Sequence, residues 1–392
     1  MRRDAIDAFV SAVHSGEPVK GFTHSFYRYP GRFSPLFARA AIQAFTEPGD
    51  VVLDPFMGGG TTLVEAAALG RHSVGTDISS LAVFLAEVKT TSLSEADLRR
   101  VADWARSLPP FLNLRRPPVR ALEWQRAGYQ RNLPWRIRKT IELALARLDE
   151  LPRQRHQRFA RCLLLKAGQW ALDCRERIPS AEEFRFELSE SLDGFVKGMR
   201  EYRQAVRENP PPGPSNAMTI SVRSAAADLS ACHAFARLPK KPTLVLTSPP
   251  YPGVHVLYHR WSVQGRRESP APFWIADCAD GQGASHYTFG DRRHHDLVRY
   301  FHGIRASFAA VRRVVSPKAL MVQMVAFSEP DWQIPAFMNA MTQAGFEEVM
   351  SEALGIPAHG PLCRAVPGRR WFASIQGQLA TSKELVLFHR PI

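Results

Sequence analysis

Short apolar runs alternate with helical patterns along most of the chain. Seven runs have the composition of buried strands: VVLD (51–54), HSVGTD (72–77), MTISV (218–222), TLVLTS (243–248), ALMVQMVAF (319–327), FEEVMSE (346–352) and ELVLFHR (384–390). Helical patterns follow several of them, as in TTLVEAAALG after the first run and LAVFLAEVKT after the second. Because consecutive parallel strands are joined by right-handed helical crossovers, this alternation predicts an α/β fold with a mostly parallel sheet and helices on both faces.

Residues 97–217 interrupt the alternation between the second and third expected strands. The spacing of Ile137, Ile141 and Leu145 is helical. Proline-rich stretches at 108–118 and 209–217 exclude helix and mark linkers. We therefore expect three parts: 1–96, the first part of an α/β domain with its glycine loop; 97–217, a helical insertion; and 218–392, the second part of the α/β domain.

The positive charge of the chain is concentrated in this insertion. Residues 97–217 contain 24 Lys and Arg against 15 Asp and Glu, so they hold 9 of the 14 net positive charges. A basic surplus of this kind suits contacts with nucleic-acid phosphates, although solvated helix faces also carry such charge. We favour nucleic-acid contact for this insertion.

Other features of the sequence exclude whole classes of protein. With 45% hydrophobic and 10% aromatic residues the chain can form a core, but it has no apolar run of about 18 residues that could span a bilayer. The first residues are interrupted by charges and predict a short helix instead of a signal peptide, so we expect a cytoplasmic protein. Five scattered cysteines form no CxxC pair, which predicts neither a disulfide framework nor a metal site.

A glycine-rich loop follows the first expected strand. Its sequence is Asp54-Pro55-Phe56-Met57-Gly58-Gly59-Gly60-Thr61-Thr62, with a helix expected from Thr61. Glycines allow the chain to turn at positive φ and let a ligand approach backbone N–H groups. Asp77 lies 19 residues after Gly58, at the end of the second expected strand, where a carboxylate can accept hydrogen bonds from ribose hydroxyls. Loop and carboxylate together indicate a nucleoside cofactor.

A second motif, the tetrad Ser248-Pro249-Pro250-Tyr251, follows the fourth expected strand. Ligands of parallel sheets bind at the carboxyl ends of strands, and two prolines hold the backbone extended there. The Ser248 oxygen and the Pro249 carbonyl could accept the two protons of a base amino group, while Tyr251 offers a face for stacking the base. The motif therefore predicts a catalytic site for chemistry on an exocyclic amino group.

DPFMGGGTT and TSPPY together resemble the motifs of amino-group DNA methyltransferases, with Gly59 in place of the usual serine. The resemblance covers roughly residues 22–90 and 218–330. It implies a Rossmann-like, seven-stranded, mostly parallel methyltransferase sheet with a helical insertion domain, and S-adenosylmethionine as cofactor. The implied cofactor-binding residues are Asp54, Pro55, Phe56, Gly58, Gly60, Thr61, Asp77 and Asp228, and the implied catalytic residues are Ser248, Pro249, Pro250 and Tyr251. The segment YRYPGRFSP (27–35) is similar to one that helps close over the cofactor.

The Ser-Pro-Pro-Tyr form of the motif is most often associated with cytosine N4, so the resemblance implies a site-specific methyltransferase acting on a base flipped out of double-stranded DNA. Three alternatives stay open: an adenine-N6 DNA methyltransferase, an RNA amino-group methyltransferase and a catalytically inactive DNA-binding subunit. A restriction nuclease or another defence protein could act alongside it. The long aromatic and basic stretch at 252–267 is expected to contact the flipped base and its flanking phosphates. The motifs encode neither a recognition sequence nor an oligomeric state.

Overall fold

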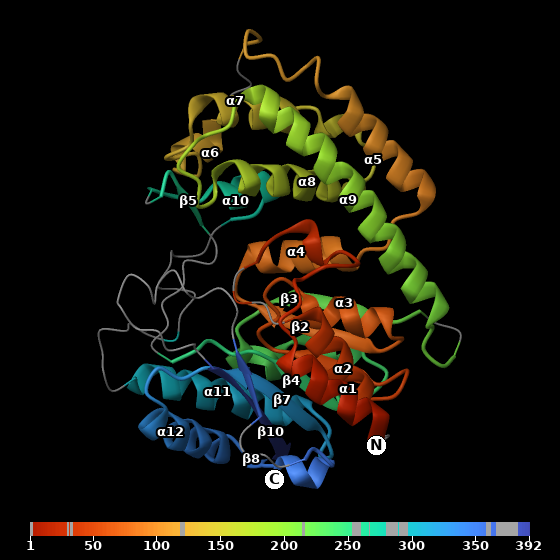
Figure 1. Ribbon diagram of the computed structural model, residues 1–392, viewed down its shortest axis with the longest axis vertical. Coiled ribbons are helices and arrows are strands. Elements are labelled where there is room, and N and C mark those ends of the chain that lie inside the picture. The colour runs from red at the N-terminus through yellow and green to blue at the C-terminus, as the bar shows by residue number, and fades with distance from the viewer. Residues whose placement is uncertain are drawn as a thin grey trace.

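The structure of the chain is a computed structural model. It describes residues 3–29, 31, 34–117, 122–213, 216–252, 260–265, 267–279, 289, 297–357, 362–365 and 383–392. Within these ranges, none of the helices combines the length and the apolar composition that crossing a membrane requires. The lower part of the molecule is an α/β sheet domain, and a helical part lies above it (Figure 1).

One mixed sheet organises the α/β part. Its strands lie in the order β3 (Thr219–Arg223), β2 (His72–Asp77), β1 (Val51–Asp54), β4 (Leu244–Thr247), β7 (Leu320–Val325), β10 (Lys383–Pro391) and β8 (Phe346–Glu348), and β9 (Cys363–Ala365) pairs with β10 as an eighth strand. The first five strands are parallel, and β10 is antiparallel to its neighbours. The predicted Rossmann-like, mostly parallel α/β fold is confirmed.

Alternate residues of the central strands bury opposite faces of the sheet. Val52, Leu244 and Val322 pack with α1 (Arg3–His14) and α2 (Pro35–Phe45). Their neighbours Leu53, Val245 and Met321 pack with α11 (Val298–Val314) and α12 (Pro330–Gln343) on the other face. Strands buried on both faces must be apolar throughout, which explains why VVLD and TLVL show no polar alternation. The other described helices of this part are α3 (Thr61–Ala68) and α4 (Ser80–Thr90). Its short 3-10 turns are η1 (His24–Phe26), η3 (Ala226–Ala231), η4 (His233–Arg237) and η6 (Ser351–Leu354).

The expected strand FEEVMSE is shorter than predicted. β8 ends at Glu348, and residues 351–354 form the turn η6 instead. β8 lies at the end of the sheet and pairs only with β10 among the described strands. Exposed Glu347 and Glu348 have no second strand to pair with, so the extended backbone ends early.

The helical part contains α5 (Glu95–Ser107), α6 (Leu122–Arg126), α7 (Trp135–Leu145), η2 (Leu148–Glu150), α8 (Gln154–Leu172) and α9 (Ala181–Glu208). α5 begins two residues before the boundary expected at 97. A hairpin of β5 (Trp261–Val263) and β6 (Arg267–Ser269), followed by α10 (Ala271–Ala276), joins the same core. This part of the segment after the tetrad therefore packs against the insertion (Figure 1), whereas the sequence indicated little regular structure there.

The segment just before α2, which includes Phe26 and Tyr27, packs between the helical part and the sheet domain. Phe26 stacks on Phe195 of α9 with ring centroids 4.0 Å apart and meets Phe159 of α8 edge-on. Tyr27 accepts a hydrogen bond from the indole nitrogen of Trp261 at 3.0 Å. All these side chains are buried, so the segment before the glycine loop is enclosed between the helical part and the sheet domain.

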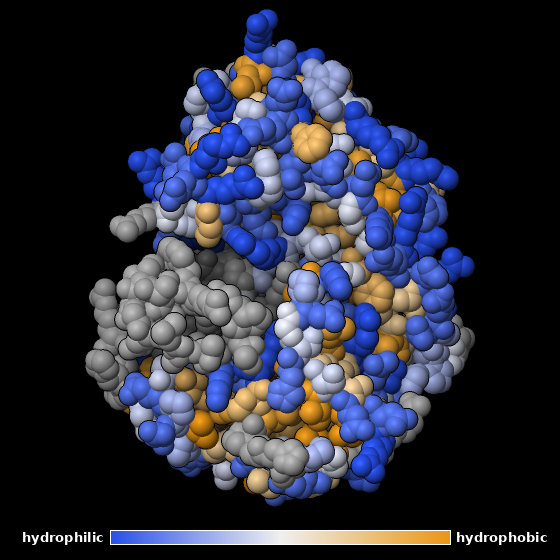
Figure 2. Space-filling view, viewed as in Figure 1, coloured by the Kyte–Doolittle hydropathy of each residue, from blue (hydrophilic) through white to orange (hydrophobic). Residues whose placement is uncertain are grey.

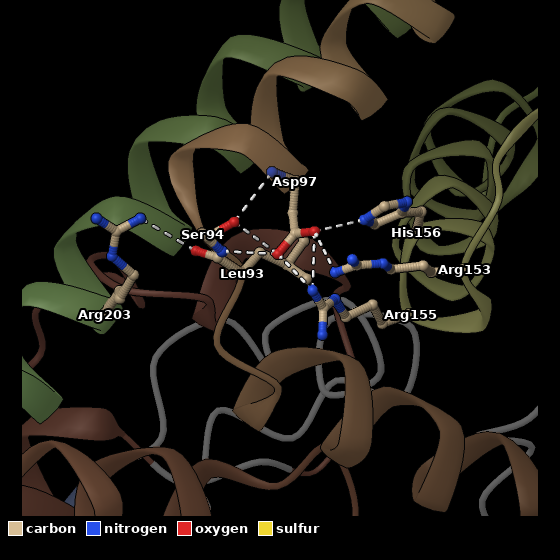
Figure 3. A network of polar contacts seen from close by, with 7 residues as sticks. All are labelled: Leu93, Ser94, Asp97, Arg153, Arg155, His156 and Arg203. Atoms are coloured by element: carbon tan, nitrogen blue, oxygen red, sulfur yellow. Dashed lines mark hydrogen bonds and ion pairs between the residues drawn. The ribbon is translucent and has the colours of Figure 1, made fainter.

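A buried carboxylate joins α5 to α8. Asp97 accepts hydrogen bonds from both the backbone and the hydroxyl of Ser94, which close a capping box at the start of α5. From α8 and its N-terminal flank come Arg155 at 2.9 Å, His156 at 2.7 Å and Arg153 at 3.5 Å. Figure 3 shows these groups converging on the one carboxylate. One aspartate thus caps its own helix and holds the next.

Candidate active site

The glycine loop turns sharply between β1 and α3. Gly58 and Gly60 have φ values of +46° and +75°, in the left-handed region that favours glycine. A side chain on Gly60 would also lie 2.9 Å from Cβ and 3.0 Å from Cα of Ala86 in α4. Gly60 therefore allows both the turn and the close approach of two helices, while the buried Thr61 begins α3.

Two residues contact the glycine loop from neighbouring segments. Tyr29 comes from the segment before α2, and Lys89 comes from α4. A Cβ on Gly59 would lie 2.8 Å from Cβ of Tyr29, and one on Gly58 would lie 3.0 Å from its ring. The ammonium group of Lys89, 1% exposed, donates to the carbonyl of Gly59 at 2.8 Å. This buried hydrogen bond fixes the middle of the loop. Of the segment YRYPGRFSP, Pro30, Arg32 and Phe33 lie outside the described residues.

Asp77 lies at the end of β2 beside the loop. Its two carboxylate oxygens accept one backbone hydrogen bond each, from Gly58 N–H at 3.0 Å and from Ser79 N–H at 2.8 Å. Burial raises the pKa of Asp77 to about 6, although these hydrogen bonds favour the ionised form. Each oxygen of a carboxylate can accept a further hydrogen bond. The half-buried Asp77 and the backbone of the glycine loop therefore fit the ribose of a nucleoside cofactor.

Asp54, at the end of β1, connects the glycine loop to the tetrad strand. Its carboxylate accepts hydrogen bonds from the hydroxyl of Thr62 at 2.6 Å, from the hydroxyl of Thr247 at 2.8 Å and from Phe56 N–H at 3.2 Å. The residue is 1% exposed, and burial raises its pKa to about 6 against these hydrogen bonds. Asp54 therefore fixes the glycine loop and the start of α3 relative to the end of β4.

Of the remaining residues expected at the cofactor, Pro55 and Phe56 belong to the loop beside this centre. Pro55 accepts a hydrogen bond from Thr76 through its carbonyl at 3.1 Å. Phe56 is half-buried and packs edge-on against Phe289 and Phe308. Asp228 is exposed in η3, just after β3, and the backbone N–H of Ser224 at the start of this connection donates to the carbonyl of Asp77 at 3.1 Å.

The tetrad begins directly after β4. Ser248 follows Thr247, the last residue of β4, whose hydroxyl donates a hydrogen bond to Asp54. Because β4 is parallel to its neighbour β1, the tetrad and the glycine loop lie at the same edge of the sheet. Pro249 is buried, and the carbonyl of Pro250 accepts a hydrogen bond from Tyr300 at 2.9 Å. Residues 253–259, which are part of the stretch 252–267 expected at the flipped base, lie outside the described residues, as does Arg266.

Two hydrogen bonds continue from the tetrad toward the C-terminal strand. The Ser248 hydroxyl donates to the Tyr251 oxygen at 3.2 Å, and the Tyr251 hydroxyl donates to Oε1 of Glu384 at 2.8 Å. Sequence reasoning missed Glu384, Tyr300 and Lys89. Each lies within an apolar or helical pattern, ELVLFHR for Glu384, in which nothing distinguishes a polar residue of the site from an ordinary surface residue.

Part of the chain is similar to known methyltransferases. A family model described as a DNA methylase of the N6 and N4 type matches residues 10–87. The chain is 36% identical over 78 residues to the Type II methyltransferase M.MjaII of Methanocaldococcus jannaschii, which covers 20% of this chain and 15% of that protein. It is 36% identical over 85 residues to the Type II methyltransferase M.MvaI of Kocuria varians, covering 21% and 19%.

A third relative is the tRNA (guanine(10)-N2)-dimethyltransferase of Methanocaldococcus jannaschii, 45% identical over 53 residues, or 13% of this chain and 15% of that protein. The chain thus spans less than a fifth of the length of each of these relatives. The matched family segment, residues 10–87, contains α2, the glycine loop, Asp77 and most of α4. Through this segment the chain is similar to DNA methylases.

Proposed function

We propose that the chain is a DNA methyltransferase that transfers a methyl group from S-adenosylmethionine to an exocyclic amino group of a base flipped out of double-stranded DNA. Cytosine N4 is the favoured position. The observation that carries this proposal is the hydrogen bonding of Asp54 to both Thr62 and Thr247. This buried carboxylate holds the cofactor loop and the start of the Ser-Pro-Pro-Tyr tetrad side by side.

The cofactor site in this proposal is built by the sheet edge. Asp77 accepts the ribose hydroxyls, and Gly58 and Gly60, both at positive φ and without Cβ atoms, let the cofactor approach the backbone of the loop. Asp54, Pro55 and Thr61 hold the loop, Phe56 forms its apolar wall, and Asp228 is proposed to face the adenine. When bound, S-adenosylmethionine supplies a methyl group carried on a positively charged sulfur.

The tetrad in this proposal orients the base. The Ser248 hydroxyl and the Pro249 carbonyl accept the two protons of the amino group, which directs the nitrogen lone pair toward the cofactor side. Tyr251 stacks on the base, a contact worth about 1 to 3 kcal/mol. Alignment of the reacting atoms supplies much of the acceleration of an in-line displacement, so the site requires no nucleophile of its own.

Substitutions in the tetrad should lower methyl transfer and leave the cofactor site intact. We expect Ser248→Ala and Tyr251→Ala to reduce the rate on DNA about tenfold each, while the Kd for S-adenosylmethionine stays within twofold of wild type. Rates come from transfer of a labelled methyl group, and Kd values from titration calorimetry. Ser11→Ala, an exposed serine on α1, is the matched control and should change neither.

The methylated nucleoside decides the base and the substrate class. Mass spectrometry of digested DNA should show N4-methylcytosine. N6-methyladenine would keep the mechanism and overturn the base assignment. Similarity over 53 residues to a tRNA methyltransferase keeps RNA as a second candidate substrate. Methyl transfer to RNA alone would establish it, and cofactor binding without transfer to either nucleic acid would indicate an inactive subunit of a restriction or defence system.

The helical part, from about 97 to 217, is proposed to lie along the DNA and to take part in target recognition. Its surface in the view of Figure 2 is mainly hydrophilic. At the start of α7, Arg131 and Arg136 are exposed, and Trp135 between them is 56% exposed. Arg138 is less suited to phosphate contact, because it is only 34% exposed and lies 3.7 Å from Glu142.

Neutralising the exposed arginines should weaken the salt dependence of DNA binding. Each phosphate contact contributes about 0.9 to the log-log slope of affinity against salt concentration. We therefore expect Arg131→Gln with Arg136→Gln to reduce the slope by roughly 1.8 and to weaken binding to all sequences alike, since phosphate contacts do not read bases. Fluorescence anisotropy over a series of salt concentrations measures the slope.

The control for this pair is Arg313→Gln with Arg390→Gln. Both of these arginines are exposed, Arg313 in the last turn of α11 and Arg390 in β10, and Figure 1 shows α11 and β10 in the sheet domain, away from α7. If the α7 pair and the control pair change the slope equally, the helical part does not line the DNA. A protein-partner role would then remain for it, and target reading would move to the segment after Tyr251.

A further inference from the structure

The hydroxyl of Tyr251 is held by a carboxylate that comes from the far end of the sequence. Glu384 lies near the start of β10, which runs antiparallel beside β7. Its side chain is 9% exposed, and its Oε1 lies 2.8 Å from the Tyr251 oxygen. Through this contact the C-terminal strand reaches the tetrad, 133 residues away in sequence.

The chemistry of the three groups fixes the direction of the hydrogen bonds. A carboxylate oxygen accepts, so Tyr251 donates its single proton to Glu384. The Tyr251 oxygen in turn accepts the proton of Ser248, which lies 3.2 Å away. With its own proton committed to Tyr251, the Ser248 oxygen presents lone pairs to any further partner.

We propose that Glu384 is a positioning residue that makes Ser248 a hydrogen-bond acceptor toward the target amino group and fixes the ring of Tyr251 for stacking. This inference rests on the proposed function. Without the carboxylate, the Tyr251 hydroxyl loses this acceptor and can donate its proton to Ser248. Ser248 would then direct its own proton toward the base, where it would meet the protons of the amino group.

The test is a double-mutant cycle with Glu384→Gln and Tyr251→Phe. Glutamine has the shape of glutamate, so the variant keeps the packing of β10, but it can offer a donor as well as an acceptor. We expect Glu384→Gln to lower kcat for methyl transfer about fivefold and to leave the Kd for S-adenosylmethionine unchanged. In the Tyr251→Phe background the same substitution should have no further effect, because the connecting hydroxyl is absent.

A structural role would give a different result. If Glu384 only stabilised β10, its substitution would lower kcat by the same factor in both backgrounds, and that outcome would overturn the inference. Glu348→Gln, an exposed glutamate on neighbouring β8, is the matched control and should leave kcat unchanged. Thermal unfolding of each variant verifies the fold.

A second measurement does not need activity. In protein without cofactor or DNA, the 13Cζ resonance of Tyr251 in labelled protein reports the hydrogen bond of its hydroxyl, and Glu384→Gln should shift it while Glu348→Gln should not. An unshifted resonance overturns the inference. Wild-type protein that transfers no methyl group to DNA or RNA overturns the proposed function instead, so the two failures are distinguishable.

Discussion

Replacing Asp97 with asparagine should lower the free energy of unfolding by about 3 kcal/mol, because it weakens the hydrogen bonds that Arg155 and His156 of α8 make to the carboxylate, each worth about 1.5 kcal/mol. Asp97 is 6% exposed and contacts Arg153, Arg155 and His156. Asparagine can keep a hydrogen bond to Ser94, so the cap of α5 should survive while the attachment of α5 to α8 weakens. Urea denaturation followed by circular dichroism measures the change.

The same helix provides a control. Asp103 is 76% exposed in its side chain and lies 3.8 Å from Arg106, and exposed pairs of this kind contribute about 0 to 1 kcal/mol. Asp103→Asn should therefore change stability by less than about 0.5 kcal/mol. Equal effects of the two substitutions would show that the Asp97 network does not hold the helical part together.

Acid should remove the contribution of Asp97. Burial would raise the pKa of this carboxyl, but hydrogen bonds from His156, Arg155 and Ser94 outweigh burial and hold the pKa well below its ordinary value. A carboxyl with a lowered folded-state pKa contributes stability above its unfolded pKa of about 4, and that stability is lost as the pH falls below it. The stability difference between wild type and Asp97→Asn should therefore shrink as the pH falls below about 4.

The parts of the fold that sequence reasoning could predict are those set by local patterns. VVLD and TLVL are short apolar runs, each followed by a motif, and HSVGTD ends in Asp77; parallel strands place such residues at one edge of the sheet. The antiparallel insertion of β10 between β7 and β8 depends on contacts between distant strands. The residues of ELVLFHR that make these contacts have no local feature that distinguishes them.

The same distinction applies to the site. The glycines and Asp77 could be identified because a tight turn needs positive φ and a ribose needs a carboxylate. The arrangement around Asp54 depends on β4 lying beside β1, because its partner Thr247 is 193 residues away. Glu384 reaches Tyr251 for the same kind of reason. Residues that are far from the motifs in the sequence can be assigned to the site only when the strand order is known.

Replacing Asp77 with alanine should weaken S-adenosylmethionine binding about a hundredfold. Two hydrogen bonds from ribose hydroxyls to a carboxylate contribute about 1.5 kcal/mol each at the lower end of their range, and about 3 kcal/mol corresponds to roughly a hundredfold in Kd. The substitution also removes the acceptors of Gly58 N–H and Ser79 N–H, which hold the loop. Titration calorimetry measures the affinity, with exposed Asp331→Ala of α12 as the control.

The pH dependence of binding separates a direct contact from a change in the loop. Because burial raises the pKa of Asp77 to about 6, its carboxyl is protonated below that pH and loses acceptor capacity. A cofactor that prefers the ionised form should therefore bind up to about tenfold more weakly for each pH unit below 6, and at constant affinity above pH 7. Asp54 has the same raised pKa but bonds only within the protein through its described contacts, so its contribution should persist in Asp77→Ala. The difference between the wild-type and Asp77→Ala profiles isolates Asp77, and parallel profiles would mean that its carboxylate does not hold the ribose.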